Sequence, residues 1–195
     1  ISKSGLVSYI ESIDETTAIL NSNLYRAAEL VKSFKEIAVN QSIEEKSRFN
    51  FREYIDSILL SLKHEYKNKN VEFKIDCPDD LVINNYSGAI SQVFTNLIMN
   101  SLIHGFKDMK SGQINISVVP EGENLIINYK DNGLGMNEEV KKRVFEPFYT
   151  PTRGKGGSGL GMNILYTLLT AKLNGKISCK SEIDKGTEFI IEIKR

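Results

Sequence analysis

The segment QVFTNLIMNSLIHG, residues 92–105, decides the fold because it combines a helical apolar pattern with regularly spaced polar side chains. Four of these recur at intervals of four residues: Gln92, Asn96, Asn100 and His104. On a helix they share one face, which drifts slowly around the axis. Asparagine is a poor helix former, so two asparagines one turn apart beside an apolar surface predict a bonding partner. That partner is either a neighbouring loop or a ligand such as Mg²⁺, which accepts amide and phosphate oxygens.

Alternating patterns surround this helix. Strands are expected at residues 49–52, 71–77, 81–84, 112–120, 124–130, 175–180 and 186–194. Helices are expected at residues 53–66, 86–105, 137–144 and 160–173. This order predicts an α+β layer, in which helices cover one face of a mostly antiparallel sheet.

The first forty residues carry a different pattern. Residues at alternating steps of four and three form a heptad seam, of which nine in ten are apolar: Leu6, Ile10, Ile13, Thr17, Leu20, Leu24, Ala27, Val31, Phe34 and Ala38. A period of 3.5 residues favours a coiled coil or helix bundle. The seam packs either on the core of its own domain or on another helix. A polar linker around residues 40–50 follows it.

Two glycine-bearing stretches raise the question of a ligand. DNGLGM, residues 131–136, places a carboxylate before ordinary turn chemistry, so it is either a plain loop or one with a ligand. TRGKGGSGLGM, residues 152–162, puts glycines and two cations before a helix, where backbone N–H groups can hold an anion. The chain lacks the glycine patterns of P-loop and Rossmann nucleotide sites.

Composition excludes several classes of protein. The 195 residues are 41% hydrophobic and 26% charged, with 25 basic and 25 acidic residues. This balance argues against a general nucleic-acid or membrane-surface binder, and no apolar run is long enough to span a membrane. Cys77 and Cys179 are far apart and have no metal-ligand spacing, so they are expected to be reduced core thiols.

The order of the motifs resembles that of the catalytic domain of sensor histidine kinases, which have the Bergerat fold. Five motifs follow one another over about a hundred residues: QVFTNLIMNSLIHG as the N box, DNGLGM as the first G box, FEPFYTP as the F box, GGSGLGM as the second G box, and KGTEF near the end. The resemblance implies two units. Residues 1–45 are similar to the second helix of the dimerisation and phosphotransfer hairpin, and residues 46–195 to the catalytic and ATP-binding domain.

The resemblance also implies roles for individual residues. Asp131 would accept a hydrogen bond from the adenine amino group, and Asn100 would bind Mg²⁺ that bridges the phosphates of ATP. Asn96 and Asn100 would act in catalysis. Gly133 and Gly135 would let the backbone approach the nucleotide. Phe145 and Phe148 would anchor the lid, which is the glycine-rich segment that follows the F box. The remaining expected nucleotide contacts are His104, Lys107, Arg153, Lys155, Gly157, Ser158, Gly159, Leu160, Gly161 and Thr187.

The residue type at position 96 indicates which reaction the site favours. In the related gyrase and mismatch-repair ATPases, the residue at this position is a glutamate that activates water. An amide takes up no proton at neutral pH, so the site favours phosphoryl transfer to another nucleophile over hydrolysis. Three alternatives remain open: a Bergerat-fold ATPase, an anti-sigma-type serine kinase and a scaffold that has lost its activity.

The chain offers no obvious phosphate acceptor of its own. Its two histidines are His104, inside the N box, and His64, in a charged helix. Neither lies in an H box, the motif on the first hairpin helix that carries the phosphorylated histidine in the family. The resemblance therefore implies that the acceptor histidine lies outside this sequence, that a response regulator is the next partner, and that the full protein dimerises through its N-terminal helix. We expect a cytoplasmic domain, with the full protein either soluble or membrane-anchored, and no nucleic-acid or membrane contact by this fragment.

Overall fold

A five-stranded sheet forms the centre of the molecule. The computed structural model describes residues 3–42, 45–150 and 159–195. The strands lie in the order β2 (Val71–Asp76), β4 (Gly112–Glu121), β5 (Asn124–Asp131), β7 (Gly186–Lys194) and β6 (Lys176–Glu182). β2 pairs with β4 in parallel, and the other pairs are antiparallel. The predicted α+β fold with a mostly antiparallel sheet is therefore confirmed.

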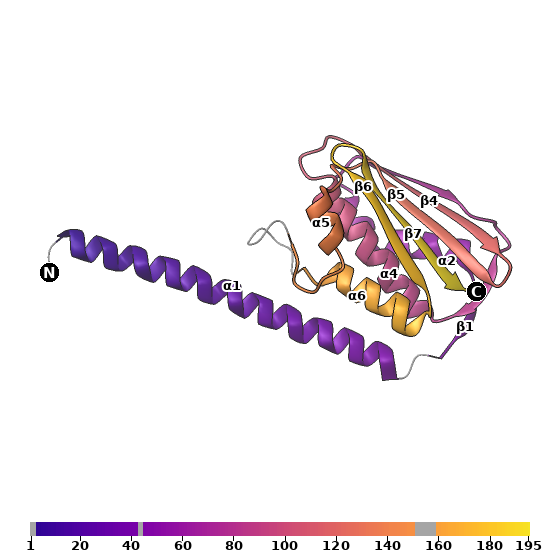
Figure 1. Ribbon diagram of the computed structural model, residues 1–195, viewed down its shortest axis with the longest axis horizontal. Helices are drawn as coiled ribbons and strands as arrows, with labels where there is room; N and C mark the ends of the chain where they lie inside the picture. The colour runs from indigo at the N-terminus through magenta and orange to yellow at the C-terminus, as the bar shows by residue number, and fades with distance from the viewer. Residues whose placement is uncertain (1–2, 43–44, 151–158) are drawn as a thin grey trace.

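Helices cover one face of this sheet (Figure 1). They are α2 (Phe51–Ser61), α3 (Lys63–Tyr66), α4 (Ser87–Asn100), α5 (Glu138–Arg143) and α6 (Gly161–Thr167). Alternate residues of the central strands point toward them, and the buried set on β5 is Leu125, Ile127, Tyr129 and Asp131. Phe94 and Leu97 of α4 belong to the same core. An acidic residue thus ends an otherwise apolar row.

The helices α4 and α6 each continue into a π-helical turn. η1 (Ser101–Gly105) follows α4, and η2 (Leu168–Lys172) follows α6. The helices predicted over residues 86–105 and 160–173 are confirmed, and their last turns are π-helical. A π turn holds more residues than an α turn, so His104 does not continue the row of Gln92, Asn96 and Asn100 at α-helical spacing.

A small second sheet leads into the domain. β1 (Ser47–Asn50) pairs antiparallel with β3 (Val82–Asn85). The predicted strand at residues 49–52 was wrong beyond Asn50, because a helix begins at Phe51. The side chain of Asn50 accepts a hydrogen bond from Glu53 N at 3.0 Å, which caps α2.

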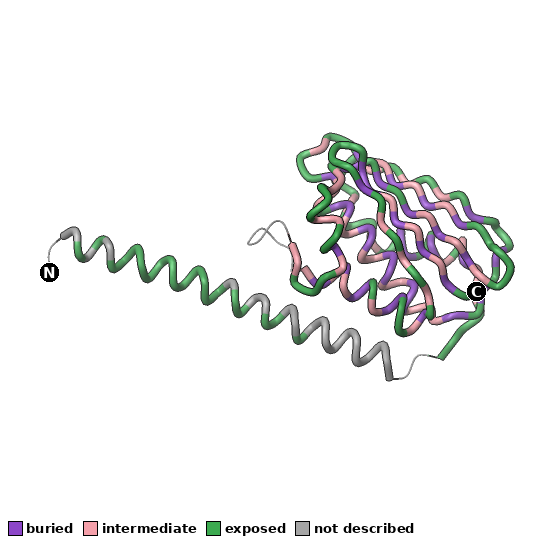
Figure 2. The backbone as a smooth tube through the Cα atoms, in the orientation of Figure 1, coloured by how far each residue is buried: buried purple, intermediate pink, exposed green. Residues whose placement is uncertain are grey.

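The N-terminal segment forms one helix, α1 (Lys3–Ser42), as its heptad pattern predicted. All six apolar seam residues whose side chains are described are exposed: Ile10, Ile13, Leu20, Leu24, Ala27 and Val31. Figure 2 shows this exposure along the described parts of α1. The seam therefore does not pack on the core of its own domain at these positions. The side chains of Leu6, Phe34 and Ala38 lie outside the described residues.

The two cysteines are free thiols within the domain. Burial raises the pKa of Cys77 to about 11 and that of Cys179 to about 12. Both thiols are therefore protonated at neutral pH, as expected for structural cysteines. None of the described helices combines the length and apolar character needed to cross a membrane.

Candidate nucleotide site

Asp131 is the centre of the site. It is the last residue of β5 and lies on the inward face of the sheet, with only 2% of its surface exposed. Its Oδ2 accepts a hydrogen bond from Ser101 Oγ at 2.7 Å, and its Oδ1 accepts from Gly133 N at 2.9 Å and Thr187 N at 3.2 Å. Burial raises the pKa of the Asp131 carboxyl, and these three hydrogen bonds partly oppose it.

The donors to Asp131 come from three separate parts of the chain. Ser101 opens η1, Gly133 lies in the loop after β5, and Thr187 lies beside Asp131 on the neighbouring strand β7. The Thr187 hydroxyl is 3.0 Å from Ser181 Oγ, which in turn accepts from Met136 N at 2.8 Å. One buried polar network therefore joins the sheet, the loop and η1.

The glycines of DNGLGM are required by close packing against protein backbone. A Cβ at Gly133 would lie 2.6 Å from the carbonyl oxygen of Gly105, which accepts a hydrogen bond from Leu134 N. Gly135 has φ +66, and a Cβ there would lie 1.9 Å from the carbonyl oxygen of Glu182. These contacts fix the loop against η1 and the turn between β6 and β7. Nucleotide approach, the role expected for both glycines, stays a prediction.

The asparagine face of α4 borders the start of α6. Asn96 and Asn100 are half-buried. The Asn96 side-chain oxygen lies 3.4 Å from Gln92 Nε2 and faces Gly161, where an added Cβ would lie 3.5 Å away. Within the described part of the chain, Asn96 Nδ2 is the one buried side-chain nitrogen or oxygen without a hydrogen-bond partner. A buried unpaired amide is costly, so a ligand that accepts from it would bind favourably.

His104 lies in η1, next to the site. Its pKa is lowered, first by burial and then by the charge of Lys107, so the imidazole is neutral at neutral pH. Lys107 is exposed. Their expected contacts with phosphate stay predictions.

The two phenylalanines of FEPFYTP behave differently. Phe145 is half-buried, and its ring lies 5.4 Å from that of Tyr166 and 6.3 Å from that of Phe189. Phe148 has φ +63 and is 48% exposed. Gly159 packs beside it with φ +70, where a Cβ would lie 2.7 Å from the Phe148 carbonyl carbon. Phe145 thus ties this segment to the core, while Phe148 faces solvent.

The glycine-rich segment is described from Gly159 onward. Leu160 is buried and Gly161 begins α6 opposite Asn96. Four expected phosphate contacts lie outside the described residues: Arg153, Lys155, Gly157 and Ser158.

Two residues of the site were missed by sequence reasoning. Ser101 donates to Asp131, and Gly105 places no side chain beside the carboxylate, where a Cβ would lie 3.6 Å from Asp131 Oδ1. Both residues fall inside the N box, so their place in that motif was the one feature of the sequence that could have identified them as part of the site. A serine in a helix has many other roles, which is why the pattern alone did not select it.

The donor set fits Mg²⁺ held mainly by its nucleotide. Among the described residues, no three His, Cys, Asp or Glu side chains gather into a metal-binding group. Asn100 would supply a neutral amide oxygen, and water and phosphate oxygens would complete the coordination.

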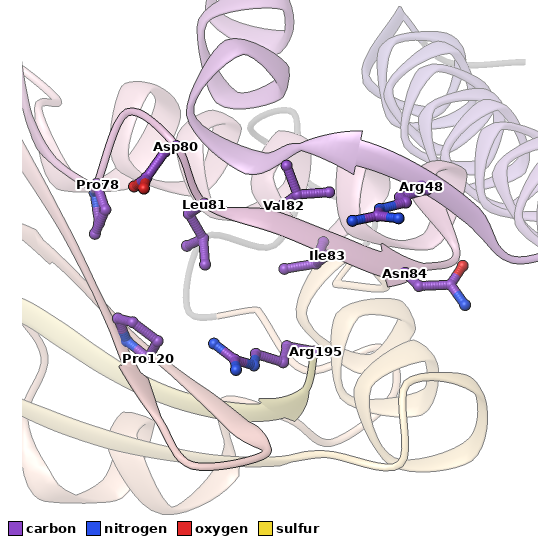
Figure 3. A pocket seen from close by; sticks show the side chains of 9 residues that line it. All are labelled: Arg48, Pro78, Asp80, Leu81, Val82, Ile83, Asn84, Pro120 and Arg195. Atoms are coloured by element: carbon purple, nitrogen blue, oxygen red, sulfur yellow. The ribbon is translucent and has the colours of Figure 1, made fainter.

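A separate groove lies at the other end of the sheet. It has a volume of about 770 Å³ and is lined by Arg48, Pro78, Asp80, Leu81, Val82, Ile83, Asn84, Pro120 and Arg195 (Figure 3). Pro120 pairs with Leu125 near the start of β5, whereas Asp131 ends that strand. The groove is therefore distinct from the site around Asp131.

Comparison with known proteins agrees with this geometry. Residues 85–195 match the family described as histidine kinase-, DNA gyrase B- and HSP90-like ATPases. Sporulation kinase B of Bacillus subtilis is 30% identical over 176 residues, which cover 88% of this chain and 39% of that protein. Sensor protein SrrB of Staphylococcus aureus is 30% identical over 211 residues, which cover 98% of this chain and 33% of that protein. The chain thus spans well under half of the length of these relatives.

Solved structures give the same result. The nucleotide-free catalytic domain of histidine kinase ThkA superposes with a TM-score of 0.67 at 26% identity, covering 77% of this chain and 95% of that chain. The complex of ThkA with the response regulator protein TrrA matches with a TM-score of 0.65 at 23% identity, over 100% of this chain and 52% of that chain. The match to the ThkA chain of this complex, at 23% identity, shows a shared fold.

Proposed function

We propose a specific reaction for this chain, which belongs to the histidine kinase-, DNA gyrase B- and HSP90-like ATPase family and carries the ATP-binding catalytic domain of a sensor histidine kinase. The site holds Mg-ATP so that the γ-phosphoryl group passes to a histidine outside this sequence. That histidine then phosphorylates the receiver domain of a response regulator. The full protein forms a homodimer through its N-terminal helix, and the reaction takes place in the cytoplasm.

Different residues would bind the two ends of the nucleotide, the adenine base and the phosphates. Asp131 would accept a hydrogen bond from the adenine amino group. Asn100 would hold Mg²⁺, which neutralises charge on the phosphates, and the backbone N–H groups that begin α6 would contact phosphate oxygens. The catalytic contribution is positioning and charge neutralisation, with Asn96 beside the phosphates.

Asn96 is the observation that carries the choice of kinase over ATPase. It occupies the α4 position that faces Gly161, and its amide nitrogen is buried without a partner among the described residues. An amide cannot deprotonate water, so this position supplies no general base for hydrolysis. It can instead hydrogen-bond a phosphate oxygen or an ordered water.

Calorimetric titration with ATP, in the presence and absence of Mg²⁺, tests this function. We expect Mg²⁺ to strengthen ATP binding, and Asn100→Ala to remove most of that gain, about tenfold in affinity or more. Asn115→Ala is the matched control, because Asn115 lies on β4 between the buried residues Ile114 and Ile116 and thus faces away from the helices. Phosphate release is followed in the same samples and should be negligible.

Each alternative function predicts a different result. Sustained phosphate release would identify an ATPase, a phosphoserine product would identify a serine kinase, and absence of ATP binding would leave a scaffold. An acid-labile phosphate on this chain would contradict an acceptor histidine outside the sequence.

A further inference from the structure

Two hydroxyl groups form a line that ends at the Asp131 carboxylate. Tyr129 OH donates to Ser101 Oγ at 3.0 Å, and Ser101 Oγ donates to Asp131 Oδ2 at 2.7 Å. All three residues are at most 2% exposed. Neither hydroxyl belongs to the residues that the family resemblance assigns to nucleotide binding.

Both hydroxyls occupy places where an apolar group would suffice for packing. Tyr129 precedes Asp131 by two residues on β5, so both side chains point toward the helices. Its ring lies in the apolar core, and Ser101 follows the apolar face of α4. A buried hydroxyl contributes favourably only when it is hydrogen-bonded, so phenylalanine and alanine would avoid that requirement. The hydroxyls therefore point to a role at Asp131.

The direction of each hydrogen bond follows from the available protons. An ionised carboxylate only accepts, so the single proton of Ser101 points at Asp131 Oδ2. Ser101 Oγ must then accept from Tyr129, and burial raises the pKa of Tyr129 well above its usual range, so the phenol keeps its proton. Both protons thus point toward Asp131.

The remaining hydrogen-bonding capacity of the carboxylate lies at Oδ2. Oδ1 already accepts from Gly133 N and Thr187 N, whereas Oδ2 accepts from Ser101. A Cβ at Gly105 would lie 3.6 Å from Oδ1 and 3.7 Å from Oδ2, so a larger side chain there would press against the carboxylate. The missing side chain leaves room for a ligand donor.

We propose that Ser101 and Tyr129 are positioning residues that orient Asp131 Oδ2 and keep it an acceptor for the amino group of adenine. They therefore set how strongly the site prefers ATP over a purine nucleotide that lacks this amino group. This inference rests on the proposed nucleotide-binding function and adds the residues that control its base specificity.

Two ligands separate this role from a purely structural one. Affinities for Mg-ATP and for the magnesium complex of purine riboside 5′-triphosphate, which lacks the amino group, are measured by calorimetry. We expect Tyr129→Phe to weaken ATP binding about threefold to tenfold and to leave the affinity for the analogue within about twofold. Tyr66→Phe is the control, because Tyr66 OH donates to Leu59 O at 3.0 Å, a backbone contact outside the hydroxyl line.

Ser101→Ala and the double variant Ser101→Ala/Tyr129→Phe complete the test. Ser101→Ala removes the donor to Asp131 and leaves the buried phenol unpaired, and the double variant removes that phenol. Because both residues act through one line, we expect the double variant to lose no more ATP preference than Ser101→Ala alone. Thermal unfolding identifies variants that are folded, and Tyr129→Phe alone suffices if Ser101→Ala does not fold.

Three results would overturn the inference. An unchanged preference for ATP in Tyr129→Phe, whether or not both affinities fall, would show a packing role only. Equal binding of both nucleotides by the unaltered chain would show that Asp131 does not recognise the amino group, although nucleotide binding itself would stand. Failure to bind either nucleotide would refute the proposed function itself.

Discussion

Burial and hydrogen bonding act in opposite directions on the Asp131 carboxyl, and burial prevails, so its pKa is raised. The carboxyl must be ionised to accept a hydrogen bond from adenine at Oδ2. We therefore predict that the preference for ATP over purine riboside triphosphate falls as the pH is lowered, and that the fall begins at a higher pH than an ordinary aspartate would require. The ratio of the two affinities cancels protonation of the phosphates, which both ligands share.

The same pKa shift affects stability with the opposite sign. A folded-state pKa above the unfolded value means that the folded protein binds this proton more readily. The contribution of Asp131 to the free energy of unfolding therefore improves as the pH falls through the folded-state pKa. Asp131→Asn does not titrate, so the difference in stability should shift toward the unaltered chain in that range. A constant difference in urea unfolding across this range would contradict the shift.

Individual residues differ in how far the sequence could predict them. Asn96 stood out because an asparagine inside a helix is an unusual choice, whereas Asp131 lies in ordinary turn chemistry and was selected by the order of the motifs. Ser101 did not stand out, because its role depends on Tyr129 and Asp131 reaching it from another element. Glycine is required at position 135 because a Cβ there would collide with the carbonyl oxygen of Glu182. This contact, too, exists only in the folded chain.

At the scale of elements, the π-helical turn η1 has a specific stabilising contact. Lys69 Nζ, from the loop before β2, donates to the carbonyl oxygen of Leu102 at 2.7 Å. We predict that Lys69→Met costs about 1 kcal/mol in the free energy of unfolding, because it removes a charged donor from this partly buried carbonyl. Urea denaturation measures this cost.

A nearby lysine provides the control for this prediction. Lys67 is also exposed and lies in the same connection, so Lys67→Met changes the same chemistry away from η1. Equal stabilities of the two variants would show that the Lys69 contact does not support the π turn. A larger loss in Lys69→Met would tie the stability of η1, which carries Ser101 and Gly105, to this one side chain.

Strands and helices were predictable where one face is buried, because an alternating or helical apolar pattern then has one solution. The π turns were not, since their hydrogen-bond pattern depends on tertiary packing. The strand expected at residues 49–52 failed for a related reason. Phe49 and Phe51 have strand-like spacing, but Phe51 is fully buried as the first residue of α2, where Asn50 supplies the cap.

At the scale of the whole molecule, the catalytic domain and α1 have different requirements for stability. The domain has its own core, formed by residues from Phe51 to Ile193. α1 instead exposes apolar seam residues, with Val31 at 69% exposed. A helix of this kind gains stability when the seam packs on another helix. The sequence predicted the seam, but its partner cannot be predicted from one chain alone.

We predict that the seam mediates self-association without contributing to nucleotide binding. Leu20→Lys/Leu24→Lys should lower the association constant of the chain in sedimentation equilibrium by about tenfold or more, because two charges would enter an apolar contact. Glu15→Lys is the control, since Glu15 is exposed at the heptad position opposite the seam. Removal of residues 1–45 should abolish association while the affinity for Mg-ATP stays within about twofold. Equal association of the seam variant and the unaltered chain would show that copies pair through another surface, and a loss of ATP binding on truncation would show that α1 supports the site.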